Sequence, residues 1–443
     1  MKKLSIIIIM FSVVTEGFAQ IKEQKQDTLY KSRVLESTEI DILTSYYSQD
    51  GDNAAVSGGI GTEKLTDFTP TIVISVPLND DDVLTLDAGI SSYTSASSSN
   101  INPFDGGQKA DPFQASSGAS RADLYTNVTG SFSHSSDDRD RIWSGKLSLS
   151  NEFDYSSFGF GGSYAWLFNE KNTEFSINGN VYLDQWKLLY PVELRSFAGR
   201  MGDDEEDGRI PWEKVTGHTP YNPSFNGFDH KSRNSYSLGL GFSQILSKKL
   251  QGSLSLDLVR QEGLLSTPYH RIYFGDKPDS FIENFQLADD VEQLPGTRSK
   301  LAVGGRLNFY LNETFVARTY YRYYTDDWGI KSHTASIEIP IKISGKFTLY
   351  PSYRFYNQTA ADYFAPYEQH SSTEKYYTSD YDLSKFNSNQ YGFGVSYTDI
   401  FTKLRVWKLH MKSIDLKFYR YERNSSFKAN MVSFGIKFTM DDL

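Results

Sequence analysis

The sequence predicts an all-β fold, a closed antiparallel transmembrane β-barrel of about 16 strands with short periplasmic turns and long extracellular loops. Three observations support this prediction. Apolar and polar residues alternate with a period of two, the longest gaps between these runs are all odd-numbered although three odd-numbered gaps are short, and aromatic residues make up 15% of the chain. An excess of Tyr and Phe beside alternating strands is typical of aromatic girdles at membrane interfaces. An array of soluble β-sandwiches is the alternative interpretation.

The N-terminus has the composition of an export signal. Lys2 and Lys3 precede an apolar run from Leu4 to Val14, and Gly17 and Ala19 stand just before Gln20. The run is too short for a transmembrane helix, and no other apolar stretch is long enough to form one. We therefore expect residues 1–19 to be a cleaved signal peptide, 20–38 a flexible periplasmic tail and 39–443 an outer-membrane barrel.

Alternating runs then follow one another along the chain. In the run 173–188, Phe175, Ile177 and Leu183 alternate with polar residues such as Asn178 and Asp184. A strand of this kind has one apolar face and one polar face. The expected strands are 39–48, 69–78, 83–95, 121–135, 140–156, 157–169, 173–188, 234–247, 250–266, 299–311, 314–330, 332–344, 346–360, 389–402, 411–424 and 428–440. Pro340 removes a ladder hydrogen bond, so we expect a β-bulge there.

The gaps between the strands separate into two kinds. Nearly all even-numbered gaps contain one to four residues, whereas every gap of about 20 residues or more is odd-numbered. The long gaps are 49–68, 96–120, 189–233, 267–298 and 361–388. Outer-membrane barrels combine short periplasmic turns with long outer loops, so both termini are expected on the periplasmic side.

Aromatic residues cluster near the ends of the expected strands. Trp and Tyr favour membrane interfaces because their rings are apolar and their tips are polar. We expect the following residues to form interface belts rather than a soluble core: Tyr46, Tyr47, Trp166, Phe168, Trp186, Trp328 and Tyr397.

If the apolar faces contact lipid, the alternate residues face the interior. The expected lumen-lining acidic residues are Asp41, Asp87, Glu152, Asp154, Asp184 and Asp257. The expected lumen-lining basic residues are Arg306, Arg318, Arg322, Lys342 and Arg354. Lys146 and Glu338 have the opposite sign to their neighbours. The pattern predicts a lumen with one acidic and one basic wall, and Asp184 is expected to face Arg318 and Arg354 across it. A narrow barrel filled with salt bridges is the alternative.

Composition excludes several classes of function. The net charge of −10 argues against a nucleic-acid-binding protein, and the absence of cysteine excludes disulfides, thiolate metal sites and a cysteine nucleophile. The acidic run Asp203–Asp207 lacks the glycine and closing glutamate of an EF-hand and is interpreted as a solvated loop. No motif indicates a metal site or a cofactor, so none is expected. Ser266 and His270 allow a hydrolase hypothesis, which lacks an identified aspartate partner.

Long segments resemble a family of uncharacterised outer-membrane barrel proteins of Bacteroidota, which is described as a domain of unknown function. The resemblance lies in TSYYSQDGDNAAVSGGIGTEKLTDFTPTI, SSYTSASSSNINPFD and RNSYSLGLGFSQILSKKLQGSLSLDLVRQEGLLSTPYHRIYF. It implies no activity and no functional residues. Genes of the family often stand near those of a periplasmic flavin transferase, a small lipoprotein and a thioredoxin-like protein, which implies a link to extracytosolic redox chemistry.

The sequence therefore predicts a non-enzymatic barrel in the outer membrane of a Gram-negative bacterium. It would act as a water-filled pore for small solutes or as a barrel scaffold or conduit. The alternative is a structural partner of a small lipoprotein or periplasmic redox protein in a flavin-linked module, and an outer-membrane hydrolase is the third hypothesis. Outer-membrane lipids are the expected partners, nucleic acid is not, and the sequence does not predict an oligomeric state.

Overall fold

The computed structural model describes residues 33–93, 123–191, 193–198, 212–218, 220–282, 285–399, 401 and 403–440. The expected signal peptide, most of the expected tail, the long gap 96–120 and the acidic run Asp203–Asp207 lie outside these residues.

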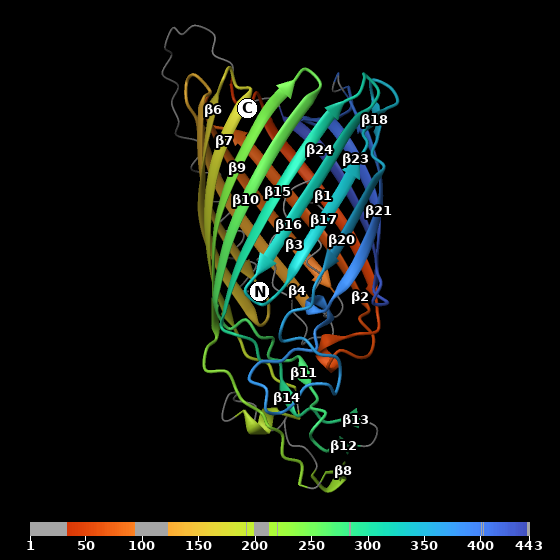
Figure 1. Cartoon of the computed structure of the whole chain (residues 1–443). Coiled ribbons are helices and arrows are strands. Elements are labelled where there is room, and N and C mark those ends of the chain that lie inside the picture. Colours follow the sequence, from red (N-terminus) through yellow and green to blue (C-terminus); the bar gives the residue numbers. More distant parts are fainter. Residues whose placement is uncertain are drawn as a thin grey trace. The chain divides into compact units, whose positions relative to one another are not determined.

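Residues 34–440 are built around one large antiparallel sheet that closes on itself, as Figure 1 shows. Its strands are β1 (Thr38–Asp50), β2 (Leu65–Pro77), β3 (Asp82–Tyr93), β4 (Asp123–Ser135), β5 (Arg141–Asn151), β6 (Tyr155–Phe168), β7 (Thr173–Trp186), β9 (Ser232–Ser247), β10 (Leu250–Gly263), β15 (Thr297–Tyr310), β16 (Val316–Asp326), β17 (Lys331–Glu338), β18 (Ile341–Lys342), β19 (Phe347–Leu349), β20 (Ser352–Gln358), β21 (Phe386–Thr398), β22 (Arg405–Val406), β23 (Leu409–Arg423) and β24 (Lys428–Met440).

The sheet forms a closed barrel of 16 staves, where a stave is one crossing of the barrel wall by a strand or by two short strands in succession. β18 continues β17, β19 leads into β20, and β22 only forms a short hairpin with β23. Each stave pairs with its neighbours in the sequence, and β1 pairs with β24 from Thr38↔Met440 to Asp50↔Lys428. The closure leaves the ring of staves without a free edge, as a β-structure in a lipid bilayer requires. The predicted all-β barrel is therefore confirmed.

The observed strands agree with the expected ones within a few residues. β5 differs most at a strand end, because it stops at Asn151 instead of at 156. β2 begins at Leu65, and β16 and β21 end at Asp326 and Thr398, each four residues from the expected bound. The turn between β5 and β6 consequently lies at 152–154 and not near Ser156. The long connections in the described residues all lie at one end of the barrel, as expected, and three short connections, 152–154, 327–330 and 424–427, lie at the same end.

Pro340 interrupts the sheet without producing the expected bulge. β17 ends at Glu338 and β18 begins at Ile341, while Pro351 interrupts the facing stave. The register is the same on both sides of the gap, because Glu338 pairs with Ser352 and Ile341 pairs with Leu349. Pro340 lies opposite Tyr350 and Pro351 lies opposite Ile339. Each proline removes a donor from its own strand, so the ladder pauses and resumes without an extra residue.

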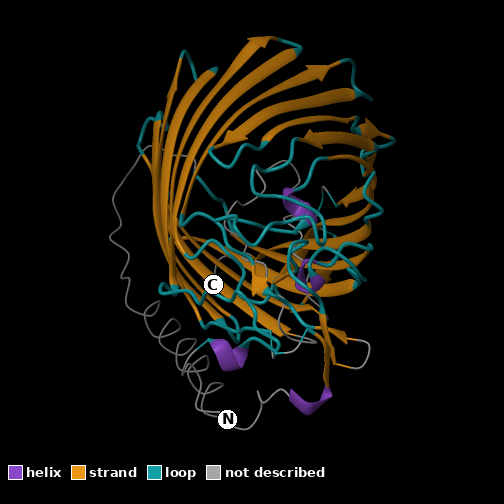
Figure 2. Cartoon of the chain, turned by 60° about the horizontal axis from the view of Figure 1, so that its bottom comes forward, coloured by secondary structure: helices purple, strands orange, loops and turns teal. Residues whose placement is uncertain are grey.

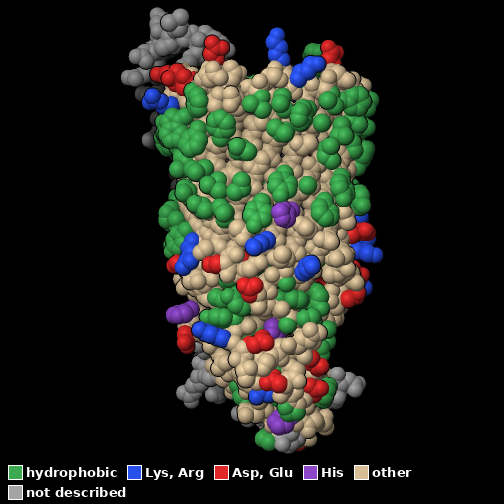
Figure 3. Space-filling view, in the orientation of Figure 1, with side chains coloured by type: hydrophobic (Ala, Val, Ile, Leu, Met, Phe, Trp, Pro, Cys, Tyr) green, Lys and Arg blue, Asp and Glu red, His purple; other side chains and the backbone are tan. Residues whose placement is uncertain are grey.

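The outer face of the barrel is apolar and exposed. Leu254 on β10 and Leu147 on β5 expose 63% and 59% of their surface, and Phe158 and Phe160 on β6 also lie among the exposed large hydrophobic residues. Figure 3 shows hydrophobic side chains as a broad band over the strands of the barrel, with charged side chains at the upper rim of the band and below it. Such a continuous exposed apolar surface is far larger than soluble monomers present.

The fully buried apolar side chains lie mainly in the long connections. Leu194, Ile272, Ala288 and Val291 have no exposed surface, and none of them belongs to a stave. These connections also contain elements that the alternation did not predict: η2 (Ala55–Ser57), η3 (Arg195–Phe197), η4 (Trp212–Lys214), β8 (Val215–Gly217), β11 (Arg271–Ile272), β12 (Ser280–Ile282), β13 (Phe285–Gln286), β14 (Asp290–Val291) and η5 (Tyr381–Leu383). β11 pairs with β14, and β12 pairs with both β8 and β13.

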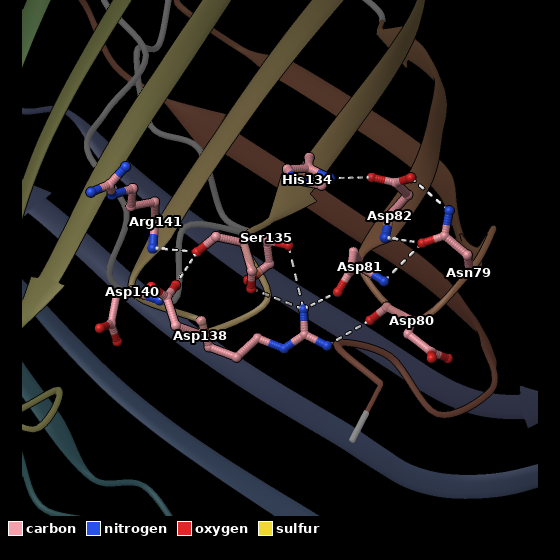
Figure 4. A network of polar contacts seen from close by, with 11 residues as sticks. Asn79, Asp80, Asp81, Asp82, His134, Ser135, Asp138, Asp140 and Arg141 are labelled. Atoms are coloured by element: carbon pink, nitrogen blue, oxygen red, sulfur yellow. Dashed lines mark hydrogen bonds and ion pairs between the residues drawn. The ribbon is translucent and has the colours of Figure 1, made fainter. Parts of the chain in front are cut away.

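A polar network joins two turns at the opposite end of the barrel (Figure 4). The Asn79 Oδ1 atom accepts hydrogen bonds from the backbone N–H groups of Asp81 and Asp82, at 2.8 and 2.9 Å. The Arg139 guanidinium donates to the Asp81 carboxylate and, at 2.9 Å, to the Asp80 carbonyl. The turn between β2 and β3 is therefore fixed to the turn between β4 and β5.

None of the helices in the described part of the chain has the length and apolar character needed to span a membrane.

Candidate lumen and loop cap

The cross-strand register places the predicted lumen residues on the face of the sheet opposite the exposed apolar one. On β7, Asp184 pairs with Ser157 while the neighbouring Leu183 pairs with Phe158 on the outer face. The same alternation continues through β9 and β10 to β15, where Arg306 pairs with Ser253. Inner-face residues of one strand pair with inner-face residues of the next, so the assignment follows from the unbroken ladder.

The acidic residues follow an arc of staves from β1 to β10. Asp41, Asp87 and Asp257 lie within β1, β3 and β10 and are partly exposed. Glu152 and Asp154 lie in the turn after β5, where both are buried and repel each other electrostatically. Two of these acidic residues are therefore buried near the long connections, and three are partly exposed along the inner wall.

The basic residues occupy the next arc, from β15 to β20. Arg306 lies over the Tyr320 ring, with 5.0 Å between the guanidinium carbon and the ring centroid. Arg318 forms an ion pair with Glu338 at 2.9 Å. Within the described residues, no carboxylate lies within ion-pair distance of Arg306, Arg322, Lys342 or Arg354. These four side chains are partly or fully exposed on the inner face, although the Arg322 Nε atom is itself buried without a hydrogen-bond partner in the described residues.

Asp184 pairs with a residue of the adjacent strand, and its expected position facing Arg318 and Arg354 across the lumen stays a prediction. Its carboxylate is paired with Arg233 on the adjacent strand β9, at 3.1 Å, and accepts a 2.7 Å hydrogen bond from Ser157. It does not form an ion pair with Arg318 or Arg354. The reason is local: the β7–β9 register places Arg233 directly opposite Asp184.

Several inner-face charges were missed in the sequence. Five further charged residues lie an even number of positions from an inner-face residue of the same strand, and therefore on the inner face: Arg233, Arg298, Lys300, Arg423 and Lys437. The sequence could have indicated these residues, because Lys300, for example, lies six positions before Arg306 on the same strand and so shares its face. Lys437 binds Glu39 at 2.7 Å and lies 3.6 Å from Asp41, which balances the acidic arc next to β24.

Two of the expected belt tryptophans instead lie in the interior. Trp186 has an even number like Asp184, so it points inward, and it packs edge-on against Tyr155 with 5.4 Å between ring centroids. Trp328 is also buried, and the guanidinium of Arg298 lies 4.3 Å from the centroid of its ring. Trp166 is exposed on the outer face, as a residue of an interface belt would be.

The long connections gather into one assembly, which we call the loop cap: the described residues of 51–64, 187–231, 264–296 and 359–385. Figure 2 shows these loops across one end of the barrel. Arg271 donates to the Val56 carbonyl at 2.9 Å, although the strand β10 that precedes it lies half-way round the ring from β1. Loops that start on opposite walls must cross the mouth to make this contact.

A buried core and ion pairs hold the loop cap together. Tyr190, Leu194, Tyr273 and Val291 pack in one cluster that combines two of the long connections. The Arg271 guanidinium also binds the Glu193 carboxylate through two hydrogen bonds of 2.6 and 3.2 Å. Bidentate pairs of this kind restrict geometry as well as adding electrostatic stabilisation. The loop cap therefore has the packing of a small domain.

Burial shifts the titration of acidic groups in the loop cap. Burial raises the pKa of Asp289 to about 6, against the lowering effect of a hydrogen bond from the Phe274 N–H group. Burial likewise raises the pKa of Asp290 to about 7, although Tyr377 donates a 2.6 Å hydrogen bond to it. Burial therefore shifts both carboxyl groups towards their neutral form relative to an aspartate in water.

The two residues of the hydrolase hypothesis lie in the loop cap. Ser266 Oγ accepts a 2.8 Å hydrogen bond from the Leu294 N–H group, and His270 Nδ1 lies 3.5 Å from Glu292 Oε2. Both side chains are buried, so an ester would need a path through the cap to reach them. The hypothesis stays a prediction.

Comparisons with known proteins give a family and a set of solved structures. The family model described as "Protein of unknown function (DUF3570)" matches residues 8–431. No curated protein matches the chain. A bacterial polysaccharide outer membrane secretin has 10% identity and a TM-score of 0.44, covering 91% of this chain and 99% of its own. A BenF-like porin from Pseudomonas fluorescens Pf-5 has 9% identity and a TM-score of 0.39, covering 92% and 100%. OccK9 (OpdG) from Pseudomonas aeruginosa has 8% identity and a TM-score of 0.39, covering 91% and 98%.

Proposed function

Because the chain belongs to the family described as "Protein of unknown function (DUF3570)", whose description assigns no activity, we propose a function from its own residues. The protein is a non-enzymatic barrel of the bacterial outer membrane that conducts small hydrophilic solutes through a charged lumen. Its loop cap limits the passage of solutes at the extracellular end.

The outer surface supports the membrane location. Exposed residues such as Leu254 and Leu147 would be unfavourable in water and favourable against lipid tails. The closed ladder satisfies the backbone groups that a bilayer leaves without water. The long connections then face the cell exterior and the short turns face the periplasm, as in other outer-membrane barrels.

The unpaired cations of the inner face are the single observation that carries the pore proposal. Lys342 is exposed, Arg306, Arg322 and Arg354 are partly exposed, and all four lack carboxylate partners in the described part of the chain. A charge without a partner is costly in a dry interior and stable in water. A salt-bridge-filled barrel would have paired these cations with the acidic arc, so we infer that the lumen between the arcs holds water.

The distribution of charge predicts ion selectivity. The variant Arg322→Glu/Arg354→Glu reverses two unpaired cations of the basic arc without breaking an ion pair. We expect its reversal potential in a salt gradient to shift towards cation preference relative to the wild type, because charged walls set selectivity in wide pores. The measurement is single-channel recording of the purified full chain in planar bilayers.

Arg260→Glu is the matched control, because Arg260 lies on the outer face of β10 and binds Glu262 there. Its reversal potential should equal that of the wild type. If the double variant conducts with an unchanged reversal potential, the two arcs do not line the conducting path and the proposal fails.

A further inference from the structure

A group of three side chains, two buried and one partly exposed, joins two segments of the loop cap. His270 precedes β11, Glu292 follows β14, and Asp380 precedes η5. One nitrogen or oxygen atom from each side chain lies within 4.8 Å of the others. We propose that His270, Glu292 and Asp380 bind a divalent metal ion that clamps the segment 264–296 to the segment 359–385. This proposal stands independently of conduction through the barrel.

His270 presents an unused nitrogen to this group. Its side chain is 6% exposed, and its Nδ1 atom is buried with no hydrogen-bond partner in the described residues. Glu292 Oε2, at 3.5 Å, lies at an ion-pair distance and beyond ordinary hydrogen-bond length. A buried nitrogen without a partner is costly, and a metal ion would satisfy it.

The backbone fixes the position of this imidazole. The His270 N–H group donates to the Thr267 carbonyl at 3.2 Å, and the Glu292 N–H group donates to the His270 carbonyl at 2.9 Å. The second bond directly connects two of the proposed ligands. The geometry of His270 and Glu292 is therefore set before any ion binds.

Hydrogen bonds orient both carboxylates. Glu292 accepts from the Thr267 N–H group through Oε1 at 2.7 Å and from the Thr378 hydroxyl through Oε2 at 2.5 Å. Asp380 accepts from the Asp382 N–H group through Oδ1 at 2.9 Å, and its own N–H group donates to Thr378 Oγ1 at 3.1 Å. Thr378 thus touches both carboxylate residues, which is the kind of support that metal ligands receive from their surroundings.

The donor set selects the class of ion. A neutral imidazole and two carboxylates supply one nitrogen and two oxygen atoms with a net charge of −2, which a divalent ion neutralises. Zn²⁺ accepts such ligands at about 2.0–2.2 Å, so they would lie up to roughly 4 Å apart. The three atoms need only a small inward movement from their present separation. Zn²⁺ and Mn²⁺ both suit a mixed imidazole and carboxylate site.

The clamp would act where the loop cap crosses the mouth. The isolated bridges Gln293↔Tyr377 and Phe274↔His370 already place the two segments side by side. A metal ion held by both segments would oppose their separation, because binding to the closed form alone stabilises that form.

The test uses the full chain purified in detergent micelles, stripped with EDTA and dialysed free of it. Zn²⁺ alone and Mn²⁺ alone are titrated by calorimetry, and bound metal is counted by mass spectrometry. We expect one ion per chain for at least one of the two metals. Asp380→Asn and His270→Gln should weaken its binding by at least about tenfold, as even loss of a supporting partner does.

His230→Gln is the control, because His230 is an exposed histidine of the loop cap outside the cluster. It should bind as the wild type does. Asp380→Asn decides the result if His270→Gln misfolds, because an Asn Oδ1 atom can still accept the hydrogen bond from the Asp382 N–H group. Limited proteolysis gives a second readout, and metal should protect the loop cap in the wild type and not in Asp380→Asn.

Two results would overturn the proposal. The first is the absence of stoichiometric binding of either metal to the wild type, which would leave a protonated His270–Glu292 ion pair as the state of the cluster. The second is equal affinity in wild type, Asp380→Asn and His270→Gln, which would mean adventitious binding elsewhere on the chain.

Discussion

Among the charged residues that the sequence predicts for the inner face, Asp184 is the most deeply buried. Its side chain is 2% exposed and is paired with Arg233, whose guanidinium lies 5.3 Å from the Trp186 ring centroid. The period of two placed Asp184 on the correct face. It could not identify Arg233, because the partner depends on which strand follows the connection 187–231 and in what register.

Asp184→Asn should destabilise the barrel strongly. The variant leaves the Arg233 cation enclosed without a carboxylate, and breaking a buried pair in this way costs about 3–5 kcal/mol. The free energy of unfolding can be measured by urea titration in micelles.

Asp87→Asn provides the matched comparison for this measurement. Asp87 also lies on the inner face, but its buried Oδ1 atom has no hydrogen-bond partner in the described residues. Its replacement should change the free energy of unfolding much less. Equal losses in the two variants would contradict the role assigned to the Asp184–Arg233 pair.

The long strands of the barrel could be predicted from the sequence, whereas the short strands of the loop cap could not. A stave of 11 to 16 residues repeats its alternation often enough to be recognised, as in β9 and β16. The strands of the loop cap contain two or three residues, which is too short for a period to appear. Their contacts are set by tertiary packing between distant segments, so the core around Leu194 and Val291 could not be predicted.

Leu194→Ala should loosen the loop cap while leaving the barrel intact. Leu194 has no exposed surface, and a leucine-to-alanine change at such a site costs about 2–5 kcal/mol. We expect faster cleavage of the long connections by added protease, with unchanged β-structure by circular dichroism.

Leu254→Ala is the control for this variant, because Leu254 is exposed on the outer face of β10. Its cleavage rate in the long connections should equal that of the wild type. If the long connections of Leu194→Ala are cleaved as slowly as those of the wild type, the buried cluster around Leu194 does not hold the loop cap closed.

At the scale of the molecule, two structures with different cores are combined in one chain. The barrel turns its apolar residues outward and its charges inward, whereas the loop cap buries its apolar residues as a water-soluble domain does. The barrel could be predicted from alternation and gap lengths. The crossing of the mouth could not, because the contact between Arg271 and Val56 joins residues far apart in sequence and on opposite walls.

We propose above all that the lumen is charged and filled with water, and that the loop cap closes it at one end. The most direct test compares single-channel conductance of the wild type with that of a variant whose residues 268–292 are replaced by a short Gly/Ser linker. This replacement removes β11, β12, β13 and β14 and leaves β10 and β15 complete.

We expect low or intermittent conductance for the wild type and a larger, sustained conductance for the variant. Equal conductance in the two proteins, or no conductance from either after insertion into the bilayer, would contradict it.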